Sequence, residues 1–354
     1  MSKGNLSKSD IVNDLKLSLP TVVQYLNELM SSGLIIESGK LRSTGGRKAK
    51  AVSCKKDARL AIGLDITNNY VNMVLVNLGG TILDSKLIHY AFSDCREYYE
   101  GIGRFIDEIL IKNKVDENRI LGVGISIPAI VSKNGKNIAF VSVSLLNIPN
   151  NFYDKLGVYI HFPYRLFNDS NSGGFAEQWI LHSSKTIVYF SLSDSVGGAI
   201  ISNGEIYYGE NYRSGEFGHM TIVPDGKKCY CGKNGCFDAY CAAHVLSAYT
   251  EGNLEKFFEQ VNAGEQKYAD IFNQYLKYLV LSIHNLRMCY DCDIILGGYM
   301  GRFLTSYLDR IRQLVKGKNM FQGDADFVKT GQYSFDATAV GGALYYIDQF
   351  IKSV

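Results

Sequence analysis

Four side chains that could bind a metal ion lie close together in the sequence. They are His219, Cys229, Cys231 and Cys236. Three cysteines and one histidine make a common tetrahedral shell for Zn²⁺, and four protein ligands close that shell, so the spacing predicts a structural zinc site. Gly232 and Gly235 lie between the last two cysteines, where a tight loop needs residues that tolerate positive φ. The alternative is that these cysteines are small buried apolar residues.

A second polar pair, Asn168 and Asp169, follows the short segment 164–167, which is expected to end a strand at a cleft. A carboxylate within hydrogen-bond reach of a hydroxyl suits either proton transfer or plain recognition. The alternative is an ordinary Asn-Asp turn, which is common at strand ends.

The elements that must position these side chains fall into two similar groups. In the first group we expect strands over 61–66, 70–77, 81–85, 120–126 and 164–167, with a helix over 95–113. In the second we expect strands over 186–192, 197–202, 205–208 and 292–298, helical stretches from 239 to 284, and a terminal helix over 342–352. Each group is too small to enclose a ligand alone, so the pattern predicts two lobes with a small-molecule site in the cleft between them.

The first sixty residues differ from the rest in charge, with 11 Lys and Arg against 5 Asp and Glu, although the whole chain is only +2. A basic segment attached to a larger body is typical of a module that binds a polyanion. The spacing here predicts helix, turn, helix, with Ser18 as N-cap and Pro20 in the first turn of the second helix.

The second helix buries an apolar stripe and leaves a polar face. Thr21, Gln24 and Asn27 share that face, and Gln or Asn there could bond to adenine in the major groove of DNA. An ordinary solvated helix face is the alternative. Strands are expected over 34–40 and 50–55, joined by a flexible basic loop, as in the wing of a winged helix. We expect phosphate contacts from Lys40, Arg42, Arg47 and Lys48; a solvated linker is the alternative.

Length and composition are consistent with a cytoplasmic protein of two or three compact units. The chain has 354 residues and is 46% hydrophobic, its start is polar, and no apolar run approaches a membrane span. Eight cysteines in a chain of this size favour metal or core roles in a reducing compartment over a disulfide framework. We expect Cys289 and Cys292, together with Cys54, Cys95, Cys241 and Trp179, to pack in the core. The alternative for Cys289 and Cys292 is a metal-binding or redox pair.

Four motifs in this order resemble the ROK family (repressors, open reading frames, kinases) over nearly the whole chain. They are Ser43-Thr-Gly-Gly-Arg47, Asn168-Asp169-Ser170-Asn171, Gly215-Glu-Phe-Gly-His219 and the cysteine loop 229–236. The resemblance implies a two-lobed, actin-like (ribonuclease H-like) α/β sugar-kinase fold after a small winged helix-turn-helix. It predicts domains over 1–59, over 60–170 joined by the C-terminal helix 342–354, and over 171–341. Repressors of the family usually carry a further helix before the segment that matches Leu6 to Val12.

The resemblance also implies residue roles. Asn168 and Asp169 match sugar ligands, and Asp169 matches the general base of the kinases. Glu216 and His219 match further sugar ligands, with His219 also on the zinc. The family's last sugar carboxylate is usually a glutamate, whereas this chain has the shorter Asp238.

The phosphate-binding segments depart from the kinase pattern. Where family kinases have Asp-x-Gly-Gly-Thr, this chain has Asp65-Ile-Thr-Asn-Asn69, and where they have Gly-Thr-Gly-x-Gly it has Ser193-Asp-Ser-Val-Gly197. Side chains in place of glycine obstruct the close approach of the backbone to a phosphate, and Asp194 adds a negative charge. The sequence therefore predicts that ATP and Mg²⁺ are not cofactors.

Together these features predict a sugar-responsive transcriptional regulator, most simply a repressor. It would bind operator DNA and a sugar or sugar-phosphate effector, as a homodimer or larger homo-oligomer, without a membrane partner. The alternatives are an ATP-dependent sugar kinase of the ROK family and a regulator that responds to a partner protein.

Overall fold

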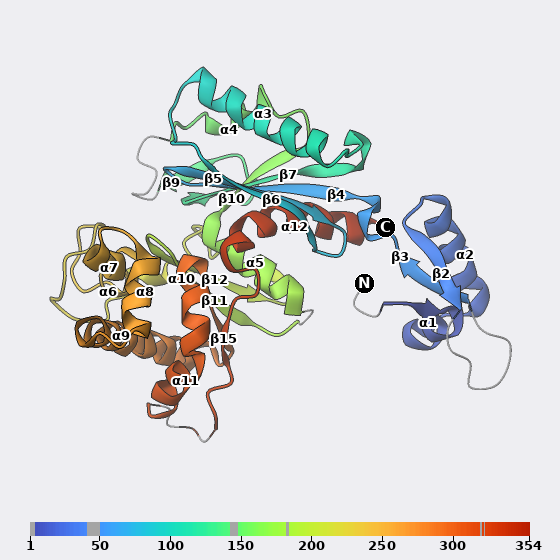
Figure 1. Ribbon diagram of the computed structural model, residues 1–354. Helices are drawn as coiled ribbons and strands as arrows, with labels where there is room; N and C mark the ends of the chain where they lie inside the picture. The colour runs from blue at the N-terminus through green and yellow to red at the C-terminus, as the bar shows by residue number, and fades with distance from the viewer. Residues whose placement is uncertain (1–3, 41–49, 142–147, 182–183, 319–320, 322) are drawn as a thin grey trace.

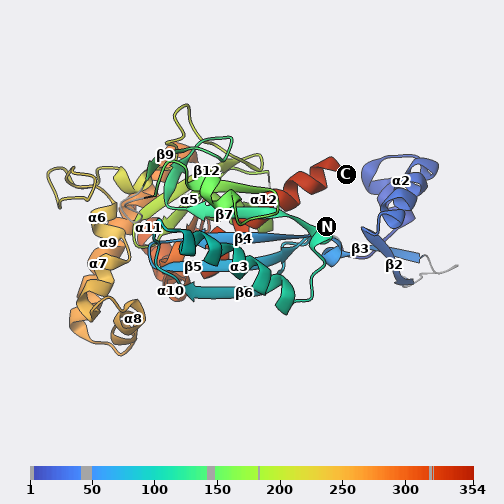
Figure 2. The same ribbon diagram turned by 90° about the horizontal axis from the view of Figure 1, so that it is seen from above.

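The computed structural model describes residues 4–40, 50–141, 148–181, 184–318, 321 and 323–354, apart from the side chain of Lys40. Figure 1 shows two large lobes and a small N-terminal unit that projects to one side. Seen from above, in Figure 2, the small unit lies beyond the C-terminal end of the last helix.

The N-terminal unit is a pair of helices on a three-stranded sheet. Its elements are β1 (Leu6–Ser7), α1 (Lys8–Leu15), α2 (Leu19–Ser31), β2 (Ile35–Lys40) and β3 (Lys50–Cys54), and the antiparallel strand order is β1-β3-β2. Ser18 caps α2 by accepting a hydrogen bond from the Thr21 amide at 3.3 Å, and Pro20 lies in the first turn, which confirms both predictions. Val22, Leu26 and Val52 form its small core.

The first lobe is built on a five-stranded sheet of order β10-β7-β4-β5-β6. A meander of three antiparallel strands is followed by two strands that run parallel to the first one. The strands are β4 (Leu60–Ile66), β5 (Tyr70–Asn77), β6 (Ile82–His89), β7 (Ile120–Ile127) and β10 (Tyr164–Asn168), and a small hairpin of β8 (Ala129–Val131) and β9 (Ile138–Val141) precedes β10. Helices α3 (Arg96–Lys112) and α4 (Phe152–Gly157) cover one face of the sheet.

The second lobe repeats this sheet, with the order β13-β12-β11-β14-β15 and the same strand directions. Its strands are β11 (Ile187–Leu192), β12 (Val196–Ser202), β13 (Glu205–Ile206), β14 (Asp293–Gly297) and β15 (Val328–Thr330). One face packs on a large helical cluster made of α6 (Asp238–Cys241), α7 (His244–Ser247), α8 (Leu254–Asn262), α9 (Gln266–Tyr290), α10 (Gly298–Leu304) and α11 (Leu308–Lys316).

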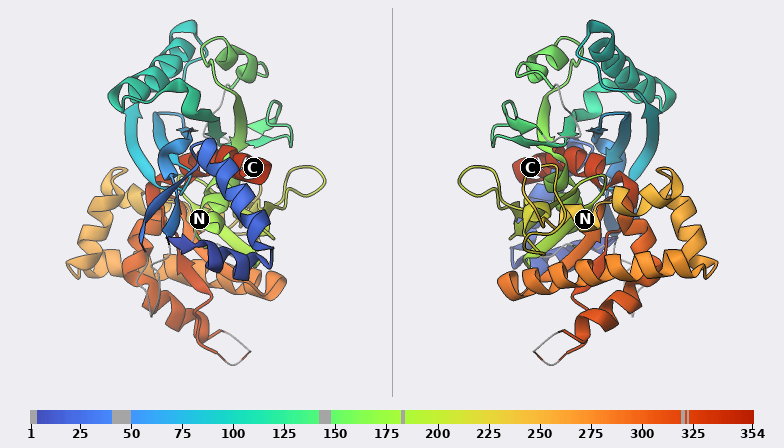
Figure 3. Two further views of the ribbon diagram at one scale, coloured as in Figure 1. Left: turned by 90° about the vertical axis from the view of Figure 1, so that its right-hand side faces the viewer. Right: turned by 90° about the vertical axis from the view of Figure 1, so that its left-hand side faces the viewer.

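Two helices lie between the lobes. α5 (Asp169–Leu181) packs on β11 and β12, and α12 (Ala337–Ser353) packs on β4 and β7. In both views of Figure 3, α12, in red, lies between the upper and the lower lobe. The two helices cross closely, because a Cβ on Gly341 would lie 1.8 Å from the Ser172 carbonyl oxygen. Leu29 and Leu34 of the N-terminal unit belong to the same hydrophobic cluster as Phe350 of α12.

This is the two-lobed, actin-like α/β fold that the sequence predicts. Several details differ. The hairpin of β8 and β9 and the helices α4, α10 and α11 were not expected. The short strands β1 and β15 were not expected, and the last helix begins at Ala337 rather than at residue 342, since Gly341 and Gly342 continue it instead of forming a turn. Cys292, Cys241 and Trp179 pack as predicted, and Cys54 and Cys95 are partly buried. The prediction of core packing was wrong for Cys289, which is exposed at the end of α9.

Within the described residues, no helix is long and apolar enough to cross a membrane.

Candidate metal centre and adjoining pocket

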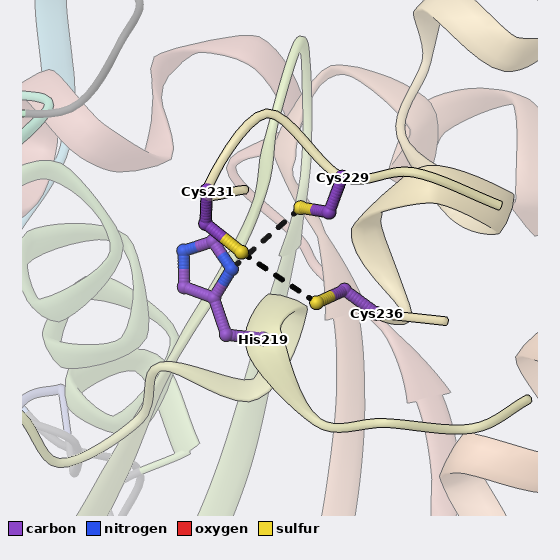
Figure 4. A group of neighbouring side chains, drawn as sticks. All are labelled: His219, Cys229, Cys231 and Cys236. Carbon is purple, nitrogen blue, oxygen red and sulfur yellow. Dashed lines mark hydrogen bonds between the residues drawn. The ribbon is translucent and has the colours of Figure 1, made fainter. Parts of the chain in front are cut away.

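The predicted metal ligands form one cluster (Figure 4). The ligand atoms of His219, Cys229, Cys231 and Cys236 all lie within 4.8 Å of one another. The distance between His219 Nδ1 and Cys229 Sγ is 3.9 Å, and that between the sulfurs of Cys231 and Cys236 is 3.7 Å. A tetrahedron with metal–sulfur bonds of about 2.3 Å has edges of about 3.8 Å. The donors and their spacing therefore fit a tetrahedral metal ion.

The loop that carries the cysteines depends on two glycines. Gly232 and Gly235 have φ values of +88° and +80°, as the sequence predicts. At Gly235 a side chain is also excluded by space, because its Cβ would lie 1.8 Å from the Val223 carbonyl oxygen. The amide of Cys229 donates to the Lys233 carbonyl at 2.8 Å, which closes the turn between the cysteines.

His219 connects this cluster to a neighbouring pocket. Its Nδ1 atom faces the sulfurs, while its Nε2 atom lies 3.3 Å from the hydroxyl of Tyr230. A metal ion on Nδ1 would leave the proton on Nε2, so the ring would present a fixed donor on the pocket side.

The pocket lies where the lobes meet and has a volume of about 50 Å³. Four of the five predicted sugar ligands line it, namely Asn168, Asp169, Glu216 and His219. Its other walls are Pro128, Ala129, Ile130, Phe140, Ser170, residues 195–198 and Tyr230. The two aromatic side chains were missed. Tyr230 could have been found from its position between two cysteine ligands, but Phe140 carries no signal in the sequence.

Asn168 is fixed by the elements on either side of it. Its Oδ1 atom accepts the amide of Asn171 at 2.9 Å at the start of α5, and its Nδ2 atom donates to the Ala129 carbonyl at 3.1 Å. The side chain is thus oriented before any ligand binds, which favours selective recognition.

Three carboxyl groups gather around the pocket, and burial raises the pKa of each. The pKa of Asp169 is raised to about 6, although hydrogen bonds from Ser170 act in the opposite direction. Glu216 borders solvent, yet the surrounding protein and the charge of Asp169 raise its pKa to about 7. Behind the pocket, burial and Asp169 raise the pKa of Asp65 to about 8. Asp169 is therefore suited to accept a proton or a hydrogen bond from a hydroxyl near neutral pH.

Asp238, the fifth predicted sugar ligand, lies elsewhere. Its side chain is 1% exposed, and its carboxylate accepts a hydrogen bond of 2.6 Å from the amide of Val196. The structure thus places this shorter carboxylate against the second phosphate segment, and it does not bring Asp238 into the pocket.

In the two phosphate segments and at the start of α10, several backbone amides that could face a phosphate donate to acceptors inside the protein. Thr67 donates to the Tyr70 carbonyl at 2.9 Å, and Ser193 to the Ser195 carbonyl at 3.2 Å. Gly298 donates to the Tyr189 hydroxyl at 3.0 Å, and the Tyr299 amide donates to the Ser193 hydroxyl at 3.1 Å. These amides are not available as an open cradle of donors.

The residues predicted to contact DNA lie partly within the described structure. Gln24 and Asn27 are exposed on α2, and Thr21 is half-buried on the same helix, with its hydroxyl 2.7 Å from that of Ser18. Gln24 donates to Glu28 at 3.1 Å. Arg42, Arg47, Lys48 and the side chain of Lys40 lie outside the described part of the chain.

The chain belongs to the ROK family, whose family model matches residues 61–349. The metal cluster and the adjoining pocket lie in this matched region, and the N-terminal unit lies before it.

Among its relatives, the xylose repressor of Bacillus subtilis (strain 168) is 28% identical over 247 residues, which cover 68% of this chain and 63% of that protein. The N-acetylmannosamine kinase of Vibrio cholerae serotype O1 is 25% identical over 257 residues, 69% of this chain and 88% of that one. The fold is also similar to that of a ROK family transcriptional regulator that is a homologue of the E. coli MLC protein. That comparison gives a TM-score of 0.73 and 19% identity, and covers 97% of this chain and 91% of the other.

Proposed function

We propose that this protein is a sugar-responsive transcriptional repressor. The observation that carries the proposal is the exposed polar face of α2, in a helix pair on a three-stranded sheet, placed ahead of a ROK body. Residues 1–59 are the DNA-binding domain, in which α2 enters the major groove and the basic loop after β2 contacts phosphates. Residues 60–170 with 342–354, and residues 171–341, are the two lobes of the sensor.

The sensor binds a sugar or sugar phosphate in the pocket lined by Asn168, Asp169, Glu216 and His219. Zn²⁺ is the metal that suits three thiolates and one imidazole, and it holds the loop beside Glu216 in place. A ligand that binds one arrangement of the lobes better than another shifts the protein toward it, and this is how the sugar alters DNA binding. The similarity to a xylose repressor supports this proposal.

Phosphotransfer is lost in this proposal, and ATP with Mg²⁺ is not a cofactor. The amides of Thr67 and Ser193 in the phosphate segments already donate to protein acceptors, and the Val196 amide is held by Asp238. A nucleotide would have to break these bonds and accommodate the charge of Asp194.

We further propose that the protein acts in the cytoplasm as a homodimer or higher homo-oligomer on a two-fold symmetric operator. Helix-turn-helix proteins bind half-sites that lie about 34–36 Å apart, or a multiple of that distance.

DNA binding is tested by fluorescence anisotropy with the upstream region of the protein's own gene, with and without a panel of sugars. We expect a salt-sensitive complex that Gln24→Ala and Asn27→Ala each weaken by about five- to 100-fold, the usual range for a lost base contact. Gln266→Ala is the matched control, because this exposed glutamine on α9 also bonds a carboxylate one helical turn away, at 2.8 Å. Equal losses in all three variants, or no complex at low salt, would refute the DNA-binding role.

An ATP-dependent sugar kinase is the second candidate. It is favoured by Asp169, whose raised pKa suits a general base, and by the similarity to an N-acetylmannosamine kinase. A coupled assay with ATP, hexoses and N-acetylhexosamines separates the two proposals. Turnover at about 1 s⁻¹ or faster that disappears in Asp169→Asn would establish the kinase.

A further inference from the structure

A second and larger pocket lies at the junction of the lobes, with a volume of about 300 Å³. The start of α5 borders both pockets, because Asp169 and Ser170 line the first one and Ser172 lines the second. The two lobes contribute Lys133, Arg165 and Phe167 on one side and residues 204–206 and Tyr208 on the other. The joining helices supply the rest of the wall.

Arg165 is the most distinctive residue of this pocket. Its guanidinium lies 4.8 Å from the ring centre of Tyr345 and 5.4 Å from that of Phe167, so two aromatic side chains flank it. Nη1 donates to the Tyr345 hydroxyl at 3.1 Å, and Nη2 donates to the Lys133 carbonyl. Nε is buried and has no hydrogen-bond partner among the residues that the structure describes. The planar fork is thus held rigidly, with donors left over.

The charge of Arg165 has no counter-ion within the described part of the chain. Among the described residues, no carboxylate forms an ion pair with it, whereas the nearby Lys352 is paired with Asp348 at 2.7 Å. Lys133 adds a second positive charge to the lining of the pocket, and Glu205 adds a negative one. A half-buried cation without a counter-ion is costly in free energy, and an anionic ligand would relieve that cost.

The remaining walls suit an organic body rather than a bare ion. Phe167, Phe175 and Tyr345 offer ring surfaces, and the volume exceeds what an inorganic anion needs. The hydroxyl of Tyr208 has no hydrogen-bond partner within the described structure. The charge of Arg165 acts on that hydroxyl, although burial is the larger effect and raises the pKa of Tyr208.

We propose that this pocket is a second effector site, for a phosphate monoester whose body packs on the aromatic walls while its phosphate meets Arg165. Arginine suits this role because its fork matches two phosphate oxygens. The site is distinct from the sugar pocket. Binding of the monoester does not depend on the proposed function, whereas its effect on the first pocket rests on that function. Since its walls come from both lobes and from the start of α5, an occupant would bias the lobe arrangement and thereby alter affinity in the first pocket.

The test is calorimetric titration of the full-length protein with phenyl phosphate and with ribose 5-phosphate, which carry an aromatic and a sugar body. Inorganic phosphate and phenol, the two halves of phenyl phosphate, are titrated separately for comparison. We expect at least one of the monoesters to bind more tightly than either part, with an affinity that falls as salt is raised. The better monoester shows which body the site prefers.

Arg165→Gln should weaken the binding of that monoester at least about tenfold, since a hydrogen bond to a charged group contributes about 1.5–3 kcal/mol. Tyr208→Phe removes one hydroxyl and should weaken binding less, about two- to tenfold, in a fold left intact. The matched control is Arg104→Gln, because Arg104 also lies over an aromatic ring, 5.6 Å from that of Phe105, but on α3 away from the pocket. It should bind as the wild type does.

Three outcomes would overturn the proposal. They are the absence of monoester binding at millimolar concentration, unchanged affinity in both Arg165→Gln and Tyr208→Phe, and loss of binding in Asp169→Asn, which would place the ligand in the first pocket. Failure of the DNA-binding experiment would leave this result unaffected, so the two proposals fail separately.

Discussion

His219 faces two sites at once. One ring nitrogen faces the thiols and the other faces the pocket, where the hydroxyl of Tyr230 lies 3.3 Å away. A metal ion would therefore fix which nitrogen donates, and loss of the metal would free the ring to rotate and to change tautomer. The metal centre can thus influence a ligand that it does not touch.

Replacing Cys231 tests that connection. We expect Cys231→Ser to lose bound zinc, because a hydroxyl is a poor zinc ligand and only three donors remain. Sugar affinity, measured by calorimetry, should fall together with the metal content, measured by mass spectrometry. Cys289→Ser is the matched control, since Cys289 is also exposed but lies outside the cluster. Zinc loss with unchanged sugar affinity would separate the two sites.

Asp65 predicts a dependence of stability on pH. Burial and the charge of Asp169 raise the pKa of this carboxyl to about 8 in the folded protein, against an ordinary value of 3.8. The folded state therefore binds the extra proton, and stability is lost as the pH rises from about 4 through 8.

Asp65→Asn removes this loss, because the amide does not titrate. Between pH 5 and pH 8, the wild type should therefore lose about 1 kcal/mol or more of unfolding free energy relative to the variant. The variant's melting temperature should rise by a few degrees relative to that of the wild type over the same range. Asp107→Asn is the control, because Asp107 is an exposed aspartate on α3. A difference that does not vary with pH would contradict the assignment.

At the scale of elements, the crossing of α5 and α12 is what joins the lobes. Gly341 leaves no room for a side chain there, so Gly341→Ala should force the helices apart and lower stability by about 1–3 kcal/mol, measured as a lower melting temperature. Gly317→Ala is the control, since the nearest atom to a Cβ there is 3.6 Å away. An unchanged melting temperature for Gly341→Ala would mean that the crossing is not tightly packed.

Most elements could be predicted from the sequence because their signals are local. The apolar strands, the capped helix after Ser18 and the ligand spacing of the cysteine loop are each visible within a few residues. Strands β1 and β15 have only two and three residues, too few to show alternation, and they form because longer strands pair with them. The start of α12 was missed because the glycine at position 341 is needed for close packing against α5 and does not mark a turn.

The sequence predicted most of the residues that line the candidate site, but it did not predict how they are arranged. Asn168, Asp169, Glu216 and His219 meet in one pocket, whereas Asp238 bonds to Val196 instead. The direction of a buried side chain depends on which distant amide lacks a partner, and a sequence does not show this. The proximity of Asp65 to Asp169 and the isolated charge of Arg165 arise in the same way, from contacts between segments far apart in the chain.

At the scale of the whole molecule, the N-terminal unit, the joining helices and the metal loop are separate parts. Removing the metal with a chelator should abolish the effect of sugar on DNA binding, while the affinity for DNA without sugar changes less than about twofold. The physical reason is that α2 lies on the N-terminal unit, far along the chain from the loop. Anisotropy titrations before and after chelation, with zinc added back as the control, measure both quantities. A large loss of DNA affinity that zinc restores would show that the metal supports the whole fold.

The bond between Asp238 and Val196 has a further consequence. A buried carboxylate already occupies an amide of the phosphate segment, so this chain carries its own tethered competitor for any anion that approaches there. A tethered group competes at a high effective concentration, which a free nucleotide must exceed. The same bond links the residues that follow the metal loop to β12. Under the proposed function, this one side chain would both hinder phosphotransfer and stiffen the sensor.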